Sequence, residues 1–473
     1  MELQLEQQQI PCLIISANRC LEERFSIDAV IPDSMPDASA LLITEGELCV
    51  WRLDLSDGNA ELEGEVAARV CYTDDHSKLI GIPVRVPVQM RIRDEKIKPG
   101  QRPFLKSRIV NLKGQLLNSR KVRVLAMVQC SLSTYDTSEL TLTTGIISEN
   151  LHPYVRKVQE TFSYLSAVEE QVIAAEETIP LQRGIPTDGR IISYASIPIA
   201  DECACRDRRV AVKGRIRTSV LYQDTNDQKL ITEVVETPFS GILDVNGEVE
   251  KCRLSLHFTS EEIRCRNDDP AVDTAFHVLV QAICYSETTV EHVADAYSNR
   301  AEIRLNWMEQ LSAEYIQHEP VQRFLEEEIA CDLTGKTICA VFAGCRGEAA
   351  DVTVLLQDMS HKFTAAVGVI KSEQEIAYLE QPSVQSGKAG LLVRAPVMIR
   401  EETETPISIP ALVSADVEEQ MVTPLSGFTF VRREETMNLW NLAKENKSSL
   451  DAIQAANPDR DQPNQWLVLP HVN

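Results

Sequence analysis

The sequence lacks any long hydrophobic run. Nowhere do about eighteen apolar residues, the length that a membrane-spanning helix requires, follow one another without interruption. The first ten residues also lack the basic region and apolar stretch of a secretory signal. We therefore expect no membrane span and a cytoplasmic protein that stays where it is made.

The sequence also has fewer basic than acidic residues. The chain of 473 residues has 47 lysines and arginines against 71 aspartates and glutamates, a formal net charge of −24. Such an excess of negative charge repels phosphate backbones at long range, which argues against nucleic acid as a partner. The chain is too long for one core of ordinary size, so about two to four domains are expected.

Motifs that bring catalytic groups together are missing as well. The sequence has no glycine-rich loop of the Walker type, no Gly-x-Ser-x-Gly and no His-Glu-x-x-His. The eight histidines are dispersed, and His257 and His361 fall in alternating apolar stretches where a structural role is expected. The sequence therefore predicts no enzymatic activity, no catalytic residue and no cofactor.

The thirteen cysteines are scattered through a chain without an export signal. This distribution is typical of reduced thiols in core positions. Cys203 and Cys205 are the closest pair, a spacing that would suit a metal ion. No second close pair with suitable histidines follows, and Cys339 and Cys345 have no histidine partner. We therefore expect no metal site.

Apolar and polar residues alternate through most of the chain. Clear examples are residues 62–68, 122–128 and 210–218. A period of two is typical of half-buried antiparallel strands, so the body is predicted to be mainly β, with sandwich-like packing. Ser163 to Ile173 is the clearest candidate for a helix.

The chain also resembles itself at an offset of 150 residues. Residues 60–72 (AELEGEVAARVCY) align with residues 210–222 (VAVKGRIRTSVLY), and a polar loop and a second apolar segment follow in both copies. The matched landmarks are Gly64 with Gly214, Tyr72 with Tyr222, and Pro87 with Pro238. The pattern predicts a hairpin in a repeated antiparallel β domain, with each glycine at a bulge or a close backbone approach.

A third, degenerate copy is expected further along, with residues 363–370 as its central strand and 378–382 as its proline-bearing strand. Stretches rich in Thr and Ser (133–148) and in Glu, Thr and Pro (401–425) are expected to be linkers, and residues 295–299 are expected to be irregular. We divide the chain into β domains at 1–140, 160–290 and 300–410, a linker at 411–425 and a C-terminal module at 426–473.

The C-terminal module has a different pattern. Residues 428–433 alternate as a strand, Leu439, Leu442 and Ala443 follow at helical spacing, and residues 466–469 close the module as a second strand. Ser449 is a suitable N-cap for a second helix that contains Ile453 and ends at Asn457 and Pro458. A small α+β module of the order βααβ is predicted, with Leu442, Ala443 and Ile453 in its core.

Three stretches of this module resemble the LysM domain: LWNLAK at 439–444, SSLDAIQAANP at 448–458 and PNQWLVLP at 463–470. In that family a sugar is held by the loop before the first helix and the loop after the second. Here the first loop, 432–438, is longer, and Asn464 replaces the closing glycine, so the resemblance implies a binding module whose ligand need not be a sugar.

The aromatic side chains of this module suit stacking on a sugar ring or anchoring a protein partner, although Trp440, in the helix motif, is expected to serve the core. The residues expected at the binding site are Arg432, Arg433, Thr436, Asn438, Trp440, Asn457, Asn464 and Trp466.

The body carries a second resemblance. Residues 32–37, Pro-Asp-Ser-Met-Pro-Asp, resemble the opening Pro-Asp-x-x-Pro-Asp motif of the SPOCS domain, and residues 117–124 (LNSRKVRV) resemble its Arg-Lys strand. SPOCS domains followed by a LysM domain describe the SipL-like sporulation proteins of Firmicutes. The resemblance implies a non-catalytic scaffold on the mother-cell side of the forespore surface. Its implied partners are the coat-basement morphogenetic ATPase, stage IV sporulation protein A, gripped by the LysM module, and other coat proteins.

Two other hypotheses stay open. The first is a LysM protein that binds peptidoglycan or N-acetylglucosamine oligomers, against which the missing export signal speaks. The second is a spore-wall hydrolase, which would need a catalytic domain that the sequence does not offer.

Overall fold

The computed structural model describes residues 3–148, 150–226, 228–266, 269–318, 320–330, 338–346, 349–356, 359–366, 374–379, 382–386, 390–418, 427–432, 438–458 and 466–471. The described residues form a mainly β molecule with several antiparallel sheets and two short helices, which confirms the predicted fold class. No helix in the described part of the chain is long and apolar enough to cross a membrane.

The first repeat is built from two antiparallel sheets packed face to face. Its strands are β1 (Gln4–Val30), β2 (Ala40–Ser56), β3 (Asn59–Thr73), β4 (Leu79–Arg93), β5 (Arg102–Asn118) and β6 (Lys121–Ile147). The order is β1-β6-β5 in one sheet and β4-β3-β2 in the other. Alternate side chains, such as Val66 of β3 and Val124 of β6, are completely buried between the sheets. Each such side chain stabilises the fold by ~1.5–3 kcal/mol, which explains the period-two pattern.

The second repeat has the same topology. Its strands are β7 (Tyr154–Pro180), β8 (Pro186–Arg206), β9 (Arg209–Asp224), β10 (Leu230–Asp244), β11 (Lys251–Cys265) and β12 (Ala271–Tyr297). The orders β7-β12-β11 and β10-β9-β8 reproduce those of the first repeat strand for strand. The predicted hairpins are β3–β4 and β9–β10, in which Pro87 lies opposite Glu65 and Pro238 lies opposite Arg215. The sequence repeat is therefore a structural repeat.

The repeated glycines lie where strands approach too closely for a side chain. A Cβ atom on Gly64 would lie 2.3 Å from the carbonyl oxygen of Cys49, and one on Gly214 would lie 2.1 Å from that of Ile199. A β-bulge lies close by in β2 in the first case and in β8 in the second. Both glycines thus have the role predicted for them. The repeated tyrosines, Tyr72 and Tyr222, are completely buried.

The two repeats share one sheet. A parallel pairing at Cys49 of β2 and Phe258 of β11 joins them into a six-stranded sheet of order β4-β3-β2-β11-β12-β7. Two strand edges that would otherwise be open therefore cover each other, which removes sites for unwanted strand pairing.

The third region is less regular. Its strands are β13 (Glu302–Gln317), β14 (Val321–Ala330), β15 (Ile338–Arg346), β16 (Ala349–Leu356), β17 (Met359–Ala366), β18 (Gln374–Leu379), β19 (Ser383–Ser386) and β20 (Gly390–Glu418). The expected strands at 363–370 and 378–382 correspond in part to β17 and β18, and their remaining residues include some outside the described ranges. The pairing of β13 with β20 repeats that of β1 with β6 and of β7 with β12.

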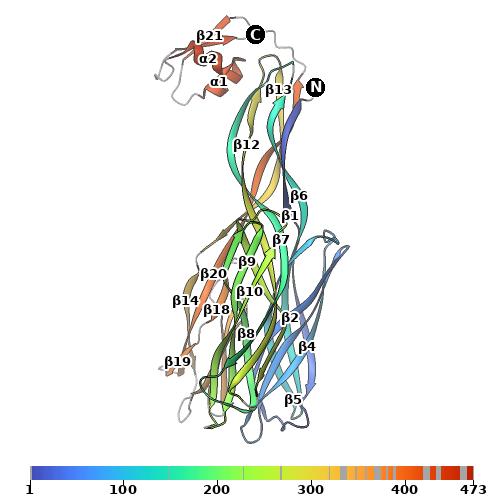
Figure 1. Ribbon diagram of the computed structural model, residues 1–473, viewed down its shortest axis with the longest axis vertical. Helices are drawn as coiled ribbons and strands as arrows, with labels where there is room; N and C mark the ends of the chain where they lie inside the picture. Colours follow the sequence, from blue (N-terminus) through green and yellow to red (C-terminus); the bar gives the residue numbers. More distant parts are fainter. Residues whose placement is uncertain are drawn as a thin grey trace.

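The first and last strands of each repeat are longer than the sandwiches require. β1, β6, β7 and β12 have 27 residues each. Beyond the sandwiches the pairs β1–β6, β7–β12 and β13–β20 continue as three ribbons, which lie side by side and which we call the stalk (Figure 1). Leu142 of β6, Phe162 of β7 and Ile409 of β20 share one buried cluster in the stalk.

The stalk corrects three sequence-based predictions. Residues 133–147 are strand in β6, residues 401–418 are strand in β20, and residues 295–297 are strand in β12, where linkers or irregular structure were expected. Residues 419–425 of the expected linker lie outside the described ranges. The boundaries expected at residues 140, 290 and 410 therefore fall inside strands.

The helix predicted for residues 163–173 is also wrong, because this segment lies in β7. Here β7 passes from the sandwich into the stalk and buries both of its faces, with Tyr164 and Leu165 buried side by side, and Ala167 and Val168 likewise. Such adjacent pairs, spaced by a half-exposed residue, imitate the spacing of an amphipathic helix.

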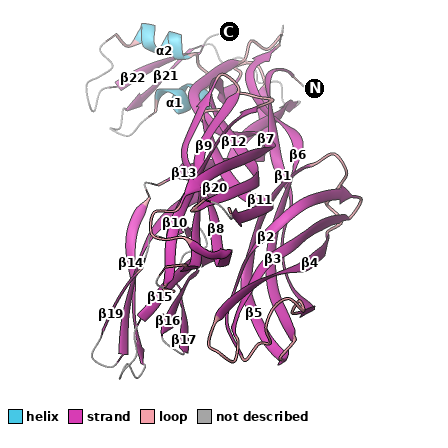
Figure 2. Cartoon of the chain, turned by 60° about the horizontal axis from the view of Figure 1, so that its bottom comes forward, coloured by secondary structure: helices cyan, strands magenta, loops and turns pink. Residues whose placement is uncertain are grey.

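The C-terminal module has the predicted order of elements. Strand β21 (Gly427–Arg432) is followed by α1 (Leu439–Glu445), α2 (Leu450–Ala456) and β22 (Trp466–His471). The two strands pair antiparallel, and the module lies at the end of the stalk, beside the N-terminus (Figures 1 and 2).

We predict that Gly214→Ala lowers the free energy of unfolding by about 1–3 kcal/mol, because the added methyl group would force backbone atoms apart. Its Cβ would meet the Ile199 carbonyl oxygen at 2.1 Å. Denaturant unfolding measures the change. Lys213→Ala, at the exposed neighbouring position, is the control and should stay within about 0.5 kcal/mol of the wild type. Equal stability of both variants would contradict the close approach.

A buried carboxyl group makes the shared sheet sensitive to pH. Glu261 of β11 is 7% exposed, and burial raises its pKa to about 8, although Tyr194, Arg69 and Arg85 favour the charged form. In the unfolded chain the pKa returns to about 4.3. Between these values the folded state keeps a proton that the unfolded state releases, so stability falls as pH rises from about 4.3 to about 8 and then levels off.

Glu261→Gln should remove this pH dependence and leave the variant more stable than the wild type near pH 8, on the order of 5 kcal/mol. Unfolding curves at a series of pH values provide the measurement. Glu262→Gln, at the exposed next position, is the matched control and should keep the wild-type slope. If the stability of the Glu261→Gln variant depends on pH as that of the wild type does, this carboxyl group is not the source of the pH dependence.

Candidate functional site

The module folds around a small apolar core. Trp440, Leu442, Ala443, Ile453, Leu467 and Leu469 form it, which confirms the predicted burial of Leu442, Ala443 and Ile453. Both helices have side-chain caps: Asn438 accepts a hydrogen bond from the Trp440 amide, and Ser449, the predicted N-cap, accepts one from the Ala452 amide, each at 2.9 Å. Because each helix has only seven residues, these caps and the core stabilise the helices.

The outer face of the β21–β22 pair is aromatic. Phe428, Phe430 and Trp466 are 69%, 62% and 62% exposed. The register places Phe430 opposite Val468 and Arg432 opposite Trp466, and alternation turns all of them to the side away from the buried Leu467 and Leu469. We call Phe428, Phe430, Arg432 and Trp466 the aromatic face. Large aromatic side chains on one exposed surface are typical of a binding site.

Trp440, one of the expected binding residues, is instead part of the join between module and stalk. It is 8% exposed, and its indole N–H donates to Asp295 Oδ2 at 2.7 Å. Its ring meets that of Tyr297 edge-on at 5.1 Å, and the guanidinium group of Arg156 lies 5.7 Å from its centre. The expectation that Trp440 serves the core is confirmed, and its burial leaves little of its ring available to a ligand.

The side chains of Asn457 and Asn438 also make hydrogen bonds within the module. The side-chain amide of Asn457 donates to the carbonyl oxygens of Ile453 and Val468, both at 2.7 Å, and its oxygen accepts from the Val468 amide at 2.8 Å. Asn457 thereby joins α2 to β22, while Asn438 caps α1. Of the eight expected residues, Arg432 and Trp466 lie on the aromatic face. Arg433, Thr436 and Asn464 lie outside the described residues.

The end of β12 fastens the module to the stalk. Besides Trp440, Lys444 donates to Asp295, at 2.7 Å, and the Tyr297 hydroxyl donates to the Ser448 carbonyl oxygen at 2.7 Å. Burial opposes the ionisation of Asp295, but the hydrogen bonds from Lys444 and Trp440 lower its pKa overall. A charged carboxylate therefore links the two parts.

Two members of the aromatic face were missed at the level of sequence. Phe428 and Phe430 were recognised as strand residues, and a strand turns alternate side chains to opposite faces. The motif used to select binding residues covers the loops and helices, so it did not include this strand. Two aromatic residues at alternate strand positions are visible in the sequence, but only the packing of the strand shows that they are exposed.

The two SPOCS-like motifs of the first repeat meet in space. The Arg120 guanidinium group donates to the carbonyl oxygens of Met35 and Pro32 and pairs with Asp33 and Asp37 of the Pro-Asp-Ser-Met-Pro-Asp loop. The hydroxyl group of the landmark Tyr72 donates to the Pro36 carbonyl oxygen at 3.0 Å. Arg120, in the turn between β5 and β6, therefore closes this loop, so the motif has a structural role here.

No protein-family model matches this chain, and the comparisons with curated proteins and with solved structures found no match. Its function therefore has to be inferred from its own residues, through the motifs of the sequence and the geometry of the aromatic face.

We predict that Asp295→Ala loosens the module from the stalk, because the Trp440 indole and the Lys444 ammonium group lose their acceptor. The loss of a buried, charge-assisted partner costs about 1.5–3 kcal/mol. Hydrogen exchange should become faster in α1 and at the end of β12. Glu291→Ala, at an exposed position of β12, should leave exchange unchanged. If the Asp295→Ala variant is protected from hydrogen exchange as well as the wild type is, the contact of Asp295 with Trp440 and Lys444 does not hold the module.

Proposed function

We propose that this chain is a non-catalytic scaffold of spore-coat assembly that binds proteins through its C-terminal LysM-like module. The observation that carries the proposal is the aromatic face, held at the far end of the stalk. Its exposed rings offer a large contact area with few side-chain torsions to order, which favours protein binding. Arg432, on the same face, adds a cation that suits an acidic group on the partner.

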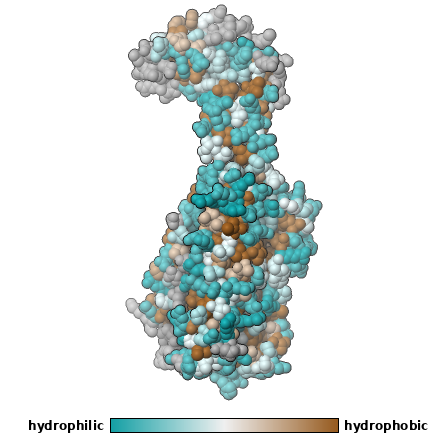
Figure 3. Space-filling view, viewed as in Figure 1, coloured by the Kyte–Doolittle hydropathy of each residue, from teal (hydrophilic) through white to brown (hydrophobic). Residues whose placement is uncertain are grey.

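The shape of the molecule supports a connecting role. The sandwiches form one end and the module the other, with the narrow stalk between them (Figures 1 and 3). Partners bound at the two ends would be held apart by a stalk of paired strands. The three ribbons bury one another's apolar side chains and so resist bending better than a single-chain linker.

The partner is inferred from the resemblance to SipL-like proteins. We propose the coat-basement morphogenetic ATPase, stage IV sporulation protein A, as the partner of the module, and other coat proteins as partners of the β domains. The site of action would be the mother-cell cytoplasm at the forespore surface. The altered loop at 432–438 supports a protein ligand rather than a glycan.

A second candidate function rests on the same rings. Phe428, Phe430 and Trp466 are exposed, and exposed aromatic rings also stack on pyranose sugars. The module would then bind N-acetylglucosamine oligomers of peptidoglycan.

Binding between the full chain and the purified ATPase tests the first proposal. Replacing both Phe430 and Trp466 with Ala should weaken binding at least ~30-fold, because aromatic anchors at the centre of an interface each contribute about 2 kcal/mol or more. Glu445→Ala, at an exposed position of α1, is the control and should bind like the wild type. Unchanged binding by the folded double variant would exclude the aromatic face as the site.

Titration of the same proteins with N-acetylglucosamine oligomers separates the two functions. Saturable sugar binding that the double variant loses, together with no binding to the ATPase, would favour the second candidate. No sugar binding, together with ATPase binding that depends on the aromatic face, would favour the first.

A further inference from the structure

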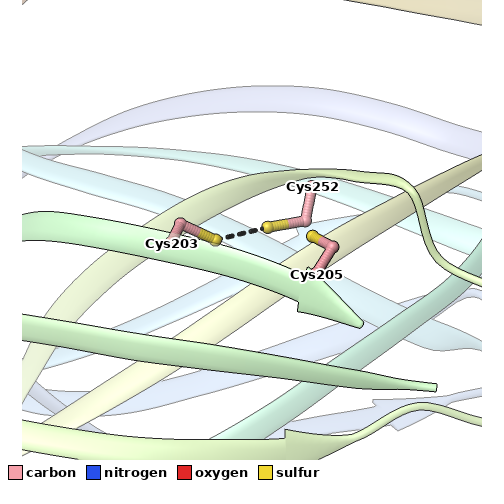
Figure 4. Close-up of side chains that lie close together, drawn as sticks. All are labelled: Cys203, Cys205 and Cys252. Carbon is pink, nitrogen blue, oxygen red and sulfur yellow. Dashed lines mark hydrogen bonds between the residues drawn. The ribbon is translucent and has the colours of Figure 1, made fainter. Parts of the chain in front are cut away.

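Three cysteines from two strands meet in the second repeat. Cys203 and Cys205 lie on β8 and Cys252 lies at the start of β11. Their Sγ atoms all lie within 4.8 Å of one another, and those of Cys203 and Cys252 are 2.8 Å apart (Figure 4). β8 and β11 belong to opposite sheets, so the three sulfurs bridge the two layers of this sandwich.

Two features of the fold bring the sulfurs together. Residues 203 and 205 are two apart on a strand, so both side chains leave the same face of β8. The second residue of β11 is Cys252, which points into the core between the sheets and is 8% exposed. Cys205 is half-buried and Cys203 is exposed, so the cluster is closed on the core side and open to solvent on the other.

The first repeat shows what this position holds without the cysteines. Cys203 pairs with Val212 and Cys205 with Val210, and 150 residues earlier Leu53 pairs with Leu62 and Leu55 with Ala60. The equivalents of Cys203 and Cys205 are thus leucines, which pack partly buried against the apolar cores of the first repeat. The second repeat has sulfur where the first has only hydrocarbon, so packing alone does not require the thiols.

Three thiol groups that lie together form a donor set suited to a soft metal ion. Soft, deprotonated sulfur is the ligand that thiophilic d¹⁰ metal ions prefer.

We propose that Cys203, Cys205 and Cys252 bind a thiophilic d¹⁰ metal ion, Zn²⁺, which ties β8 to β11 across the second repeat. Three sulfurs at about 2.3 Å from one ion in tetrahedral geometry lie ~3.8 Å apart, which small side-chain rotations provide from the observed cluster. Water supplies the fourth ligand on the open side, next to the exposed Cys203. The site adds a cross-link between sheets that no part of the proposed binding function requires.

The test uses the full chain, purified under reducing conditions, incubated with Zn²⁺ and then dialysed. Metal analysis should find about one more Zn²⁺ per wild-type chain than per chain of the variant with Cys203→Ser and Cys205→Ser. A second titration uses Cd²⁺, whose bonds to thiolates give a charge-transfer absorption in the ultraviolet. This absorption should be reduced in the variant, and added Zn²⁺ should raise the melting temperature of the wild type more than that of the variant.

Cys265→Ser is the matched control, because it removes a half-buried thiol from the same strand, β11, outside the cluster. It should bind Zn²⁺ and Cd²⁺ like the wild type. Cys203→Ser alone changes an exposed side chain, so it should fold and still lose metal affinity by at least tenfold. Equal Zn²⁺ affinity of the wild type and of the folded Cys203→Ser variant would overturn the proposal. Peptide mapping that finds Cys203 and Cys252 joined by a disulfide in chains that take up no Zn²⁺ would overturn it as well.

Discussion

The molecule depends on the mutual burial of three two-stranded ribbons. A single ribbon of this kind is marginally stable in water, since one face of its apolar side chains stays exposed. Here the three ribbons pack together, with Leu142, Phe162 and Ile409 in one cluster. Polar bonds fix their alignment: the side-chain amide of Gln310 donates to the Thr141 carbonyl oxygen, and its oxygen accepts from the Thr141 amide, each at 2.9 Å. The packed and hydrogen-bonded ribbons together hold the module away from the sandwiches.

Open sheet edges are also covered where the sandwiches meet. Each repeat has a sheet edge that its own strands leave open, and the pairing of β2 with β11 joins two of these edges. The third region is joined through charge, because Arg253 of β11 pairs with Glu402 and Glu404 of β20 at 3.1 and 3.2 Å. All three groups are largely shielded from water, so removal of one partner would leave an unpaired charge in a poorly solvated place. The two repeats and the third region are therefore joined into one continuous body.

The module divides its aromatic residues between two tasks. Trp440 is buried against Tyr297 and Asp295 and serves attachment. Phe430 and Trp466 are exposed on the opposite side of the core and remain available for a ligand. This division explains how a module of under fifty residues can be held firmly at the end of the stalk and still offer a binding surface. Its attachment uses the helix that carries the most recognisable LysM-like motif, so the motif by itself is a poor guide to the ligand site.

Local rules determined much of this protein from sequence alone. Alternation showed the strands, the offset of 150 residues showed the repeat and the positions of Gly64 and Gly214, and capping chemistry placed Ser449 at a helix start. The tertiary structure alone decided the stalk, the aromatic face and the cysteine cluster. Each of these depends on which distant strands come together, and a strand that buries both faces loses the period of two that reveals it. Cys252 lies 47 residues from Cys205, and only the packing of one sheet on another brings their sulfurs into contact.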